Sequence, residues 1–153
     1  MSSRLFIQVR ERKGLCYFIR ASNTPLEDTG TFVIQSGLEA ARVPLALRTI
    51  KAEVAKIKAS GVTARELAEA KENIRGRLLL TLEDSSDRAD WFATQELFMP
   101  KVKSPEQYLQ AVSKVTAAQV KAAAKQILDL SRLTVAAIGP FKDEKDFLKK
   151  AGL

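Results

Sequence analysis

The most informative absence in this sequence of 153 residues is histidine, of which there is none. Zinc catalysis and most general-base schemes rely on imidazole, and the single cysteine, Cys16, cannot replace a full set of ligands. We therefore expect no conventional zinc site on this chain. One thiol also excludes an internal disulfide framework. We interpret Cys16 as a small packing residue because no acid–base partner is evident beside it.

Long apolar runs are also missing. The longest, such as 78–80, are far too short to cross a bilayer, so we expect no membrane-spanning segment. Met1 is followed by the polar Ser2 and Ser3 and by no apolar stretch of signal-peptide length. We therefore expect no signal peptide on this chain, and the sequence assigns the protein to no compartment.

The composition is that of one folded domain. Hydrophobic residues make up 46% of the chain and charged residues 28%, with few glycines and prolines. The net charge is +7, but lysines such as Lys51, Lys56 and Lys58 recur at helical spacing and indicate a solvated helix face. No aromatic residues interleave with the basic ones. We therefore expect no nucleic-acid partner; a basic nucleic-acid module, the least favoured alternative, would bind phosphates in a salt-dependent way.

The first part of the chain predicts a helix followed by a β-hairpin. Residues 2–13 carry an apolar stripe at helical spacing after a serine that can cap the helix. Residues 15–24 and 31–38 then alternate with period two around a turn-rich loop, which is typical of an antiparallel pair. Simple alternation would place Tyr17 and Ile19 on the same face of the first strand.

The rest of the chain predicts mainly helices. Their N-terminal signals, among them three capping boxes, stand at Pro44, Thr63, Asp84, Ser104 and Thr116. Residues 133–138 predict a short third strand, and 143–150 a final charged helix. The order is thus α-β-β-α-α-α-α-α-β-α. We expect a single α+β domain over 1–153, an antiparallel sheet covered on one face by helices.

A motif at the start of the chain carries a family resemblance. Residues 1–17 read MSSRLFIQVRERKGLCY, which closely resembles a stretch of the pitrilysin/insulinase metallopeptidase family, to which mitochondrial processing peptidases belong. Weaker similarity continues almost to the end of the chain, at 30–34, 115–116, 133–135 and 139–140. The family domain has further strands and a helix before the Ser-Arg-Leu segment. We therefore expect this chain to be the C-terminal portion of a peptidase-like domain.

The resemblance implies a division of labour between two homologous domains. One binds zinc through an inverted His-x-x-Glu-His helix, the inverzincin motif, which is absent here. The other supplies an arginine and a tyrosine that map onto Arg10 and Tyr17. The resemblance thus implies a non-zinc-binding half of a zinc-dependent endopeptidase, with zinc in the partner catalytic domain and a peptide as substrate. In that role Tyr17 would bind the oxyanion and Arg10 the substrate backbone.

Elementary chemistry is compatible with these two roles. A phenol is a neutral donor for developing negative charge, and a guanidinium is a fixed fork of donors. Gly14 folds the chain between Arg10 and Tyr17, which would bring both side chains to one edge of the sheet. Without the resemblance, Tyr17 would be a half-buried packing residue and Arg10 a solvated partner of the helix dipole.

Two further expectations concern function and assembly. An inactive scaffold, like the core subunits of respiratory complexes that share this fold, is the alternative to a peptidase half. Three strands make a thin sheet, since the mean is about 5 or 6. Its open edges predict self-association, most simply as a twofold dimer, or pairing with a complementary fragment. We interpret three glutamates at helical spacing, Glu66, Glu69 and Glu72, as a solvated face with no metal.

Overall fold

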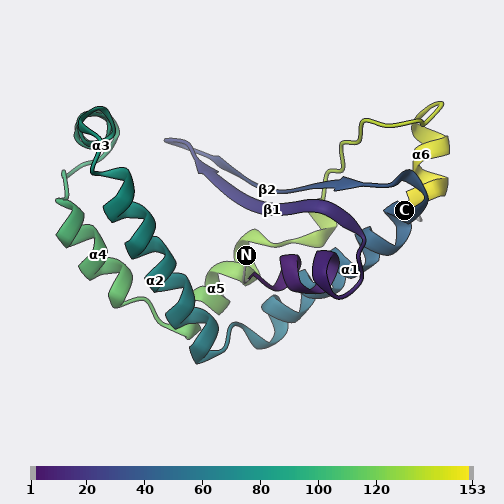
Figure 1. Cartoon of the computed structure of the whole chain (residues 1–153), viewed down its shortest axis with the longest axis horizontal. Helices are drawn as coiled ribbons and strands as arrows, with labels where there is room; N and C mark the ends of the chain where they lie inside the picture. Colours follow the sequence, from purple (N-terminus) through teal and green to yellow (C-terminus); the bar gives the residue numbers. More distant parts are fainter. Residues whose placement is uncertain (1–2, 152–153) are drawn as a thin grey trace. The chain divides into compact units, whose positions relative to one another are not determined.

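The computed structural model describes residues 3–151, which fold as two compact units (Figure 1). The first unit comprises residues 3–59 and 124–151, and the second comprises 60–123. Among the described residues, no helix combines the length and the apolar character that a membrane span requires.

The first unit begins with the π-helix η1 (Phe6–Glu11) and a hairpin of β1 (Cys16–Pro25) and β2 (Gly30–Leu38). The 3-10 turn η2 (Ala40–Arg42) leads into α1 (Val43–Ser60), and the chain later returns with η3 (Leu130–Arg132) and α6 (Glu144–Ala151). The second unit contains α2 (Ala64–Thr81), α3 (Ser85–Phe98), α4 (Pro105–Ser113) and most of α5 (Ala117–Ile127).

The core of the first unit lies between the hairpin and two helices. Four buried side chains form it, one from η1, one from the following turn, one from β1 and one from α1: Val9, Leu15, Ile19 and Ala46. Partly buried apolar residues of both strands, including Ile34 and Leu38, pack around them. Figure 1 shows η1 and α1 on the same side of the hairpin. The antiparallel sheet is therefore covered by helices on one face, as predicted, because apolar side chains of both strands pack against those helices.

The first helix is wider than the α-helix that its apolar spacing predicts. The backbone N–H of Arg12 donates to the carbonyl of Ile7, five residues back, at 2.9 Å. Ser3 caps the start, because its hydroxyl oxygen accepts from the N–H of Phe6 at 3.2 Å. Gly14 ends the element with a φ of 58°, in the left-handed region that glycine adopts most easily. The predicted Ser2 cap lies outside the described residues.

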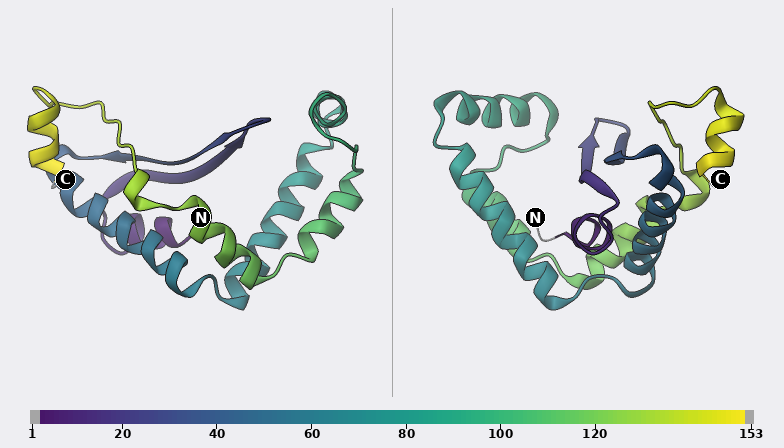
Figure 2. Two further views of the ribbon diagram at one scale, coloured as in Figure 1. Left: turned by 180° about the vertical axis from the view of Figure 1, so that it is seen from behind. Right: turned by 45° about the vertical axis from the view of Figure 1, so that its right-hand side comes forward.

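The second unit is built on helices whose starts the sequence predicted. The capping boxes of Thr63 with Glu66 and of Ser104 with Gln107 are both formed. In the two views of Figure 2, α2 and α4 run side by side, and Lys71 of α2 donates to the carbonyl of Ser113 at the end of α4 at 2.7 Å. The ring of Trp91 in α3 meets Tyr108 in α4 edge-on, with centroids 5.3 Å apart.

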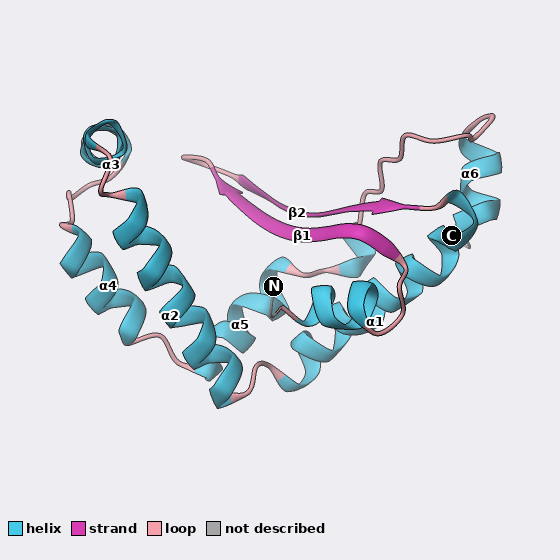
Figure 3. Cartoon of the chain, viewed as in Figure 1, coloured by secondary structure: helices cyan, strands magenta, loops and turns pink. Residues whose placement is uncertain are grey.

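The predicted strand at 133–138 is wrong. Among the described residues the sheet has only β1 and β2, and Figure 3 draws the segment before α6 as loop. A strand exists only where its N–H and C=O groups find a ladder partner, and this segment pairs with neither strand of the hairpin. Its apolar residues are not buried as expected, since Ile138 is fully exposed.

Candidate functional site

Arg10 lies in the last turn of η1, and contacts within that helix orient its side chain. The guanidinium carbon sits 4.8 Å from the centroid of the Phe6 ring, a distance suited to a cation–π contact. A long ion pair of 3.8 Å joins Nη1 to Glu11, and the side chain stays 40% exposed. The guanidinium thus lies against the Phe6 ring. Because the side chain is still partly exposed, its N–H groups toward solvent remain available to bind an oxygen.

Tyr17 occupies an irregular position at the start of β1. Cys16 is opposite Leu38 in the hairpin, but Phe18 is opposite Gly37, so the strand carries one extra residue between them. That extra residue is Tyr17, which makes the feature a β-bulge. Bulges redirect side chains, and this one turns the Tyr17 ring to solvent, where it is 73% exposed.

The bulge also corrects the predicted alternation of β1. Ile19 is 7% exposed in the core, whereas Tyr17 points away from it, so the two do not share a face. The hydroxyl of Ser36 secures the ladder next to the bulge by donating to the carbonyl of Phe18 at 2.9 Å. Within the described residues the Tyr17 hydroxyl forms no hydrogen bond. It is therefore available to donate to a group from outside the chain.

Arg10 and Tyr17 stand at the two ends of one short turn, residues 11–16. Backbone bonds close this turn: the N–H of Gly14 donates to the carbonyl of Arg10, and the N–H of Leu15 to that of Val9, each at 2.9 Å. No hydrogen bond, ion pair or ring contact between Arg10 and Tyr17 is present in the part of the chain that the structure describes. A hydrogen-bonded turn therefore joins the two residues. Their convergence on one substrate stays a prediction.

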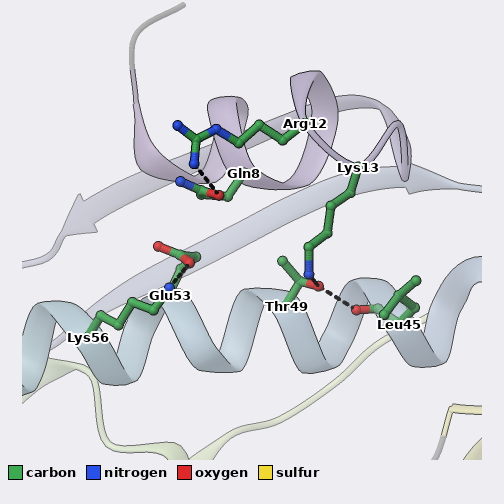
Figure 4. A network of polar contacts seen from close by, with 7 residues as sticks. All are labelled: Gln8, Arg12, Lys13, Leu45, Thr49, Glu53 and Lys56. Atoms are coloured by element: carbon green, nitrogen blue, oxygen red, sulfur yellow. Dashed lines mark hydrogen bonds and ion pairs between the residues drawn. The ribbon is translucent and has the colours of Figure 1, made fainter.

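Two side chains from outside the turn hold it, and local sequence patterns give no sign of either. Arg42, just before α1, donates from Nη1 to the carbonyl of Gly14 at 2.7 Å. Lys13 donates from Nζ to the hydroxyl of Thr49 at 3.1 Å, and Thr49 donates in turn to the carbonyl of Leu45 at 2.8 Å (Figure 4). These partners lie 28 and 36 residues apart in the sequence, which is why no short motif reveals them.

A buried carboxylate lies one turn beyond Thr49 on α1. Glu53 is 5% exposed, and Figure 4 shows it on the side of α1 that faces η1. Lys56 donates to it at 2.6 Å, so the buried charge is compensated. The pair joins two side chains of the same helix, three residues apart.

No other place in the described residues offers a catalytic set. Groups of three or more His, Cys, Asp or Glu that could hold a metal ion are absent between residues 3 and 151. A shallow hollow beside α6 is lined by apolar residues such as Leu130 and Phe147, with Lys51 and Glu144 as its charged members. No hydrogen bond or ion pair between these two charged side chains is present in the described part of the chain, so nothing indicates an activated nucleophile there. Arg10 and Tyr17 therefore remain the candidate site.

Comparison with known proteins identifies the family of the chain and does not test the roles of Arg10 and Tyr17. The family described as the peptidase M16 inactive domain matches residues 1–74. An uncharacterized zinc protease of Bacillus subtilis is 33% identical over 127 residues, which are 83% of this chain and 31% of that protein. One from Mycobacterium leprae is 32% identical over 145 residues, 95% of this chain and 32% of that protein. The chain belongs to the peptidase M16 inactive-domain family. It spans about a third of the length of these two relatives.

Solved structures show the same M16 fold. A peptidase M16 inactive domain from Pseudomonas fluorescens superposes with a TM-score of 0.74 at 25% identity, over 83% of this chain and 30% of that one. A conserved protein from Enterococcus faecalis gives a TM-score of 0.69 at 25% identity, over 81% of this chain and 29% of that one. The chain is thus an α+β inactive M16 domain of a zinc protease family.

Proposed function

We propose that this chain is the non-zinc-binding half of a zinc-dependent endopeptidase, in which Arg10 and Tyr17 contact the peptide substrate. The observation that carries the proposal is the bulge at Tyr17, which exposes a phenol hydroxyl that no described residue engages. Within this proposal residues 1–153 act as one α+β domain, the C-terminal portion of a peptidase-like domain.

Tyr17 has the chemistry to stabilise a tetrahedral intermediate. When a peptide carbonyl is attacked, negative charge develops on its oxygen, and a neutral hydroxyl positioned beforehand can donate to that charge. A hydrogen bond to the negatively charged oxygen is stronger than one to the uncharged carbonyl, so the phenol stabilises the transition state more than the bound substrate. Tyr17 therefore acts on the rate of the chemical step.

Arg10 has the chemistry to hold the substrate before and during that step. Its guanidinium presents several donors in one plane, which suits a backbone carbonyl or a carboxylate of the peptide. Such a contact exists in the ground state as well as in the transition state. We therefore assign Arg10 to binding, and expect its loss to raise KM more than it lowers kcat.

The proposal requires a homologous partner that binds zinc. The relatives of this chain are named zinc proteases, whereas its own described residues contain no metal-binding group. Zinc bound by the partner would supply an activated water molecule. This chain would contribute the opposite wall of the site, where Tyr17 donates and Arg10 orients the peptide.

The test replaces Tyr17 in the assembled enzyme. The chain is combined with its zinc-binding partner, and cleavage of a fluorescence-quenched peptide is followed. Tyr17→Phe should lower kcat by about 10² to 10³, the cost of one oxyanion donor, with unchanged zinc content and melting temperature. Tyr108→Phe is the matched control, because Tyr108 packs on Trp91 in the second unit, and it should leave kcat unchanged. Full activity of Tyr17→Phe would disprove the assigned role, whereas an unchanged assembly that cleaves no peptide would favour the inactive scaffold.

The isolated chain provides a second test. It should neither retain zinc after dialysis nor cleave the same peptide, because it contains no histidine and its described residues form no metal-binding group. Elemental analysis measures the first property and the peptide assay the second. Stoichiometric zinc together with peptidase activity in the isolated chain would contradict the proposal that catalysis needs a partner.

A further inference from the structure

The turn that joins Arg10 to Tyr17 is fixed by residues that lie outside it. Arg42 donates to the carbonyl of Gly14 at 2.7 Å, and its Nε is itself held by Glu39 at 3.0 Å. A carbonyl oxygen in the middle of a turn is otherwise left to solvent. The guanidinium therefore ties the centre of the turn to the segment that precedes α1.

A second anchor acts one residue earlier. The ammonium of Lys13 reaches the hydroxyl of Thr49, which is 5% exposed and whose own proton goes to the carbonyl of Leu45 (Figure 4). Because Thr49 is buried and donates to the backbone of α1, its oxygen is a rigid acceptor. The Lys13 side chain is thus bound at a fixed point on α1.

We infer that Arg42 and Thr49 are positioning residues for Tyr17. The inference rests on the proposed function, since it states how that site is kept in place. With η1 packed on the core at one end and the bulge at the other, the two anchors act together with the backbone hydrogen bonds of the turn to set the path of residues 12–15. The anchors act through the backbone, and neither is required to touch the substrate.

These anchors are suited to positioning more than to stability. Arg42 is 46% exposed, and a hydrogen bond at the surface adds little to the free energy of folding. Placement is far more sensitive, because a shift of about 1 Å in a substrate-contacting group costs up to roughly 10²-fold in rate. Variants of Arg42 should therefore fold normally and still place Tyr17 poorly.

The first experiment observes Tyr17 directly in this chain. With 3-fluorotyrosine incorporated in a Tyr108→Phe background, one fluorine resonance reports on Tyr17. Arg42→Ala and Thr49→Val should broaden or split this resonance, while Thr49→Ser, which keeps the hydroxyl, should not. Arg75→Ala is the matched control for loss of a surface arginine, since Arg75 lies on α2 in the second unit. An unchanged resonance in Arg42→Ala would overturn the inference.

The second experiment asks whether positioning is coupled to the reaction. In the assembled enzyme, Arg42→Ala should lower kcat about 10-fold or more with little change in KM or melting temperature, and Arg42→Lys should recover part of the loss. In a Tyr17→Phe background the same change should have almost no further effect, because both act on one donor. Equal effects in the two backgrounds would contradict the inference. If Tyr17→Phe itself is silent, the proposed function fails, and the fluorine resonance still decides the positioning role.

Discussion

At the scale of single residues, one inserted residue in β1 separates the core from the candidate site. Ile19 is buried against η1 and α1, and Tyr17, two positions earlier, is exposed because the bulge interrupts the alternation. Without the insertion, alternation would carry Tyr17 to the core face with Ile19. The bulge therefore allows the same strand to supply both a packing residue and a solvent-facing phenol.

The buried position of Ile19 leads to a stability prediction. Ile19→Val removes one methyl group from a packed core and should lower the free energy of unfolding by about 0.5 to 1.5 kcal/mol. Ile138→Val makes the same chemical change at a fully exposed site and should have almost no effect. Urea denaturation of both variants measures the difference, and equal losses would show that Ile19 does not pack in the core.

The sequence indicated candidate site residues but not their geometry. Arg10 and Tyr17 became candidates because residues 1–17 resemble a family motif, and their roles stay a prediction. The bulge could not be predicted from the sequence, because it depends on how Cys16 and Phe18 pair with the second strand. The contact of Arg42 could not be predicted either, because the residue to which it donates, Gly14, lies 28 positions away.

At the scale of elements, helix starts followed from the sequence and strand pairing did not. Helix caps are local, and the predicted boxes at Thr63, Ser104 and Thr116 are all formed. Strands require a partner that can come from anywhere in the chain, and the segment 133–138 has none among the described residues. Apolar composition alone therefore overpredicted the sheet.

The α2 helix contains a glycine that should weaken it. No atom lies within 4 Å of a Cβ built on Gly76, so Gly76→Ala fits and should raise the free energy of unfolding by about 0.5 to 1 kcal/mol. Gly61→Ala is the opposing control, because Gly61 has a φ of +76° and its Cβ would meet Lys121 at 3.3 Å. Thermal or urea unfolding distinguishes them. A loss of stability in Gly76→Ala would contradict the helix geometry.

The cap of α3 predicts a dependence on pH. Asp84 accepts hydrogen bonds from the hydroxyl and the N–H of Ser86, and these lower the pKa of its carboxyl, the hydroxyl most. Because the folded pKa is below the unfolded one, the cap stabilises α3 above the unfolded pKa and loses this effect as the pH falls through the folded pKa. Ser86→Ala should raise the pKa of Asp84 toward its ordinary value.

An NMR titration of the Asp84 carboxyl carbon measures this shift. Ser131→Ala is the matched control, since Ser131 makes the same hydroxyl contact with Asp129 and should leave the Asp84 pKa unchanged. An unaltered Asp84 pKa in Ser86→Ala would show that its hydroxyl does not make the bond.

At the scale of the whole molecule, the described structure leaves polar backbone and apolar side chains uncovered. Its sheet has two strands, each paired along one side only, which leaves N–H and C=O groups of both outer edges without a ladder partner. Exposed apolar residues occur on this hairpin and at the end of α3, including Phe32, Val33, Leu97 and Phe98. Surfaces of this kind are typical of interfaces with another chain.

We therefore predict that the isolated chain self-associates, most simply as a twofold dimer. Open strand edges offer unpaired N–H and C=O groups to a second copy, and burial of Val33 and its neighbours would add apolar contact. Sedimentation equilibrium over a wide range of concentrations measures the association. Val33→Lys should weaken it, because a charge on an edge strand opposes pairing. Leu26→Lys, at the exposed tip of the hairpin, is the control and should have little effect. A monomer at every concentration, unfolding cooperatively, would show that these residues need no partner to complete their fold.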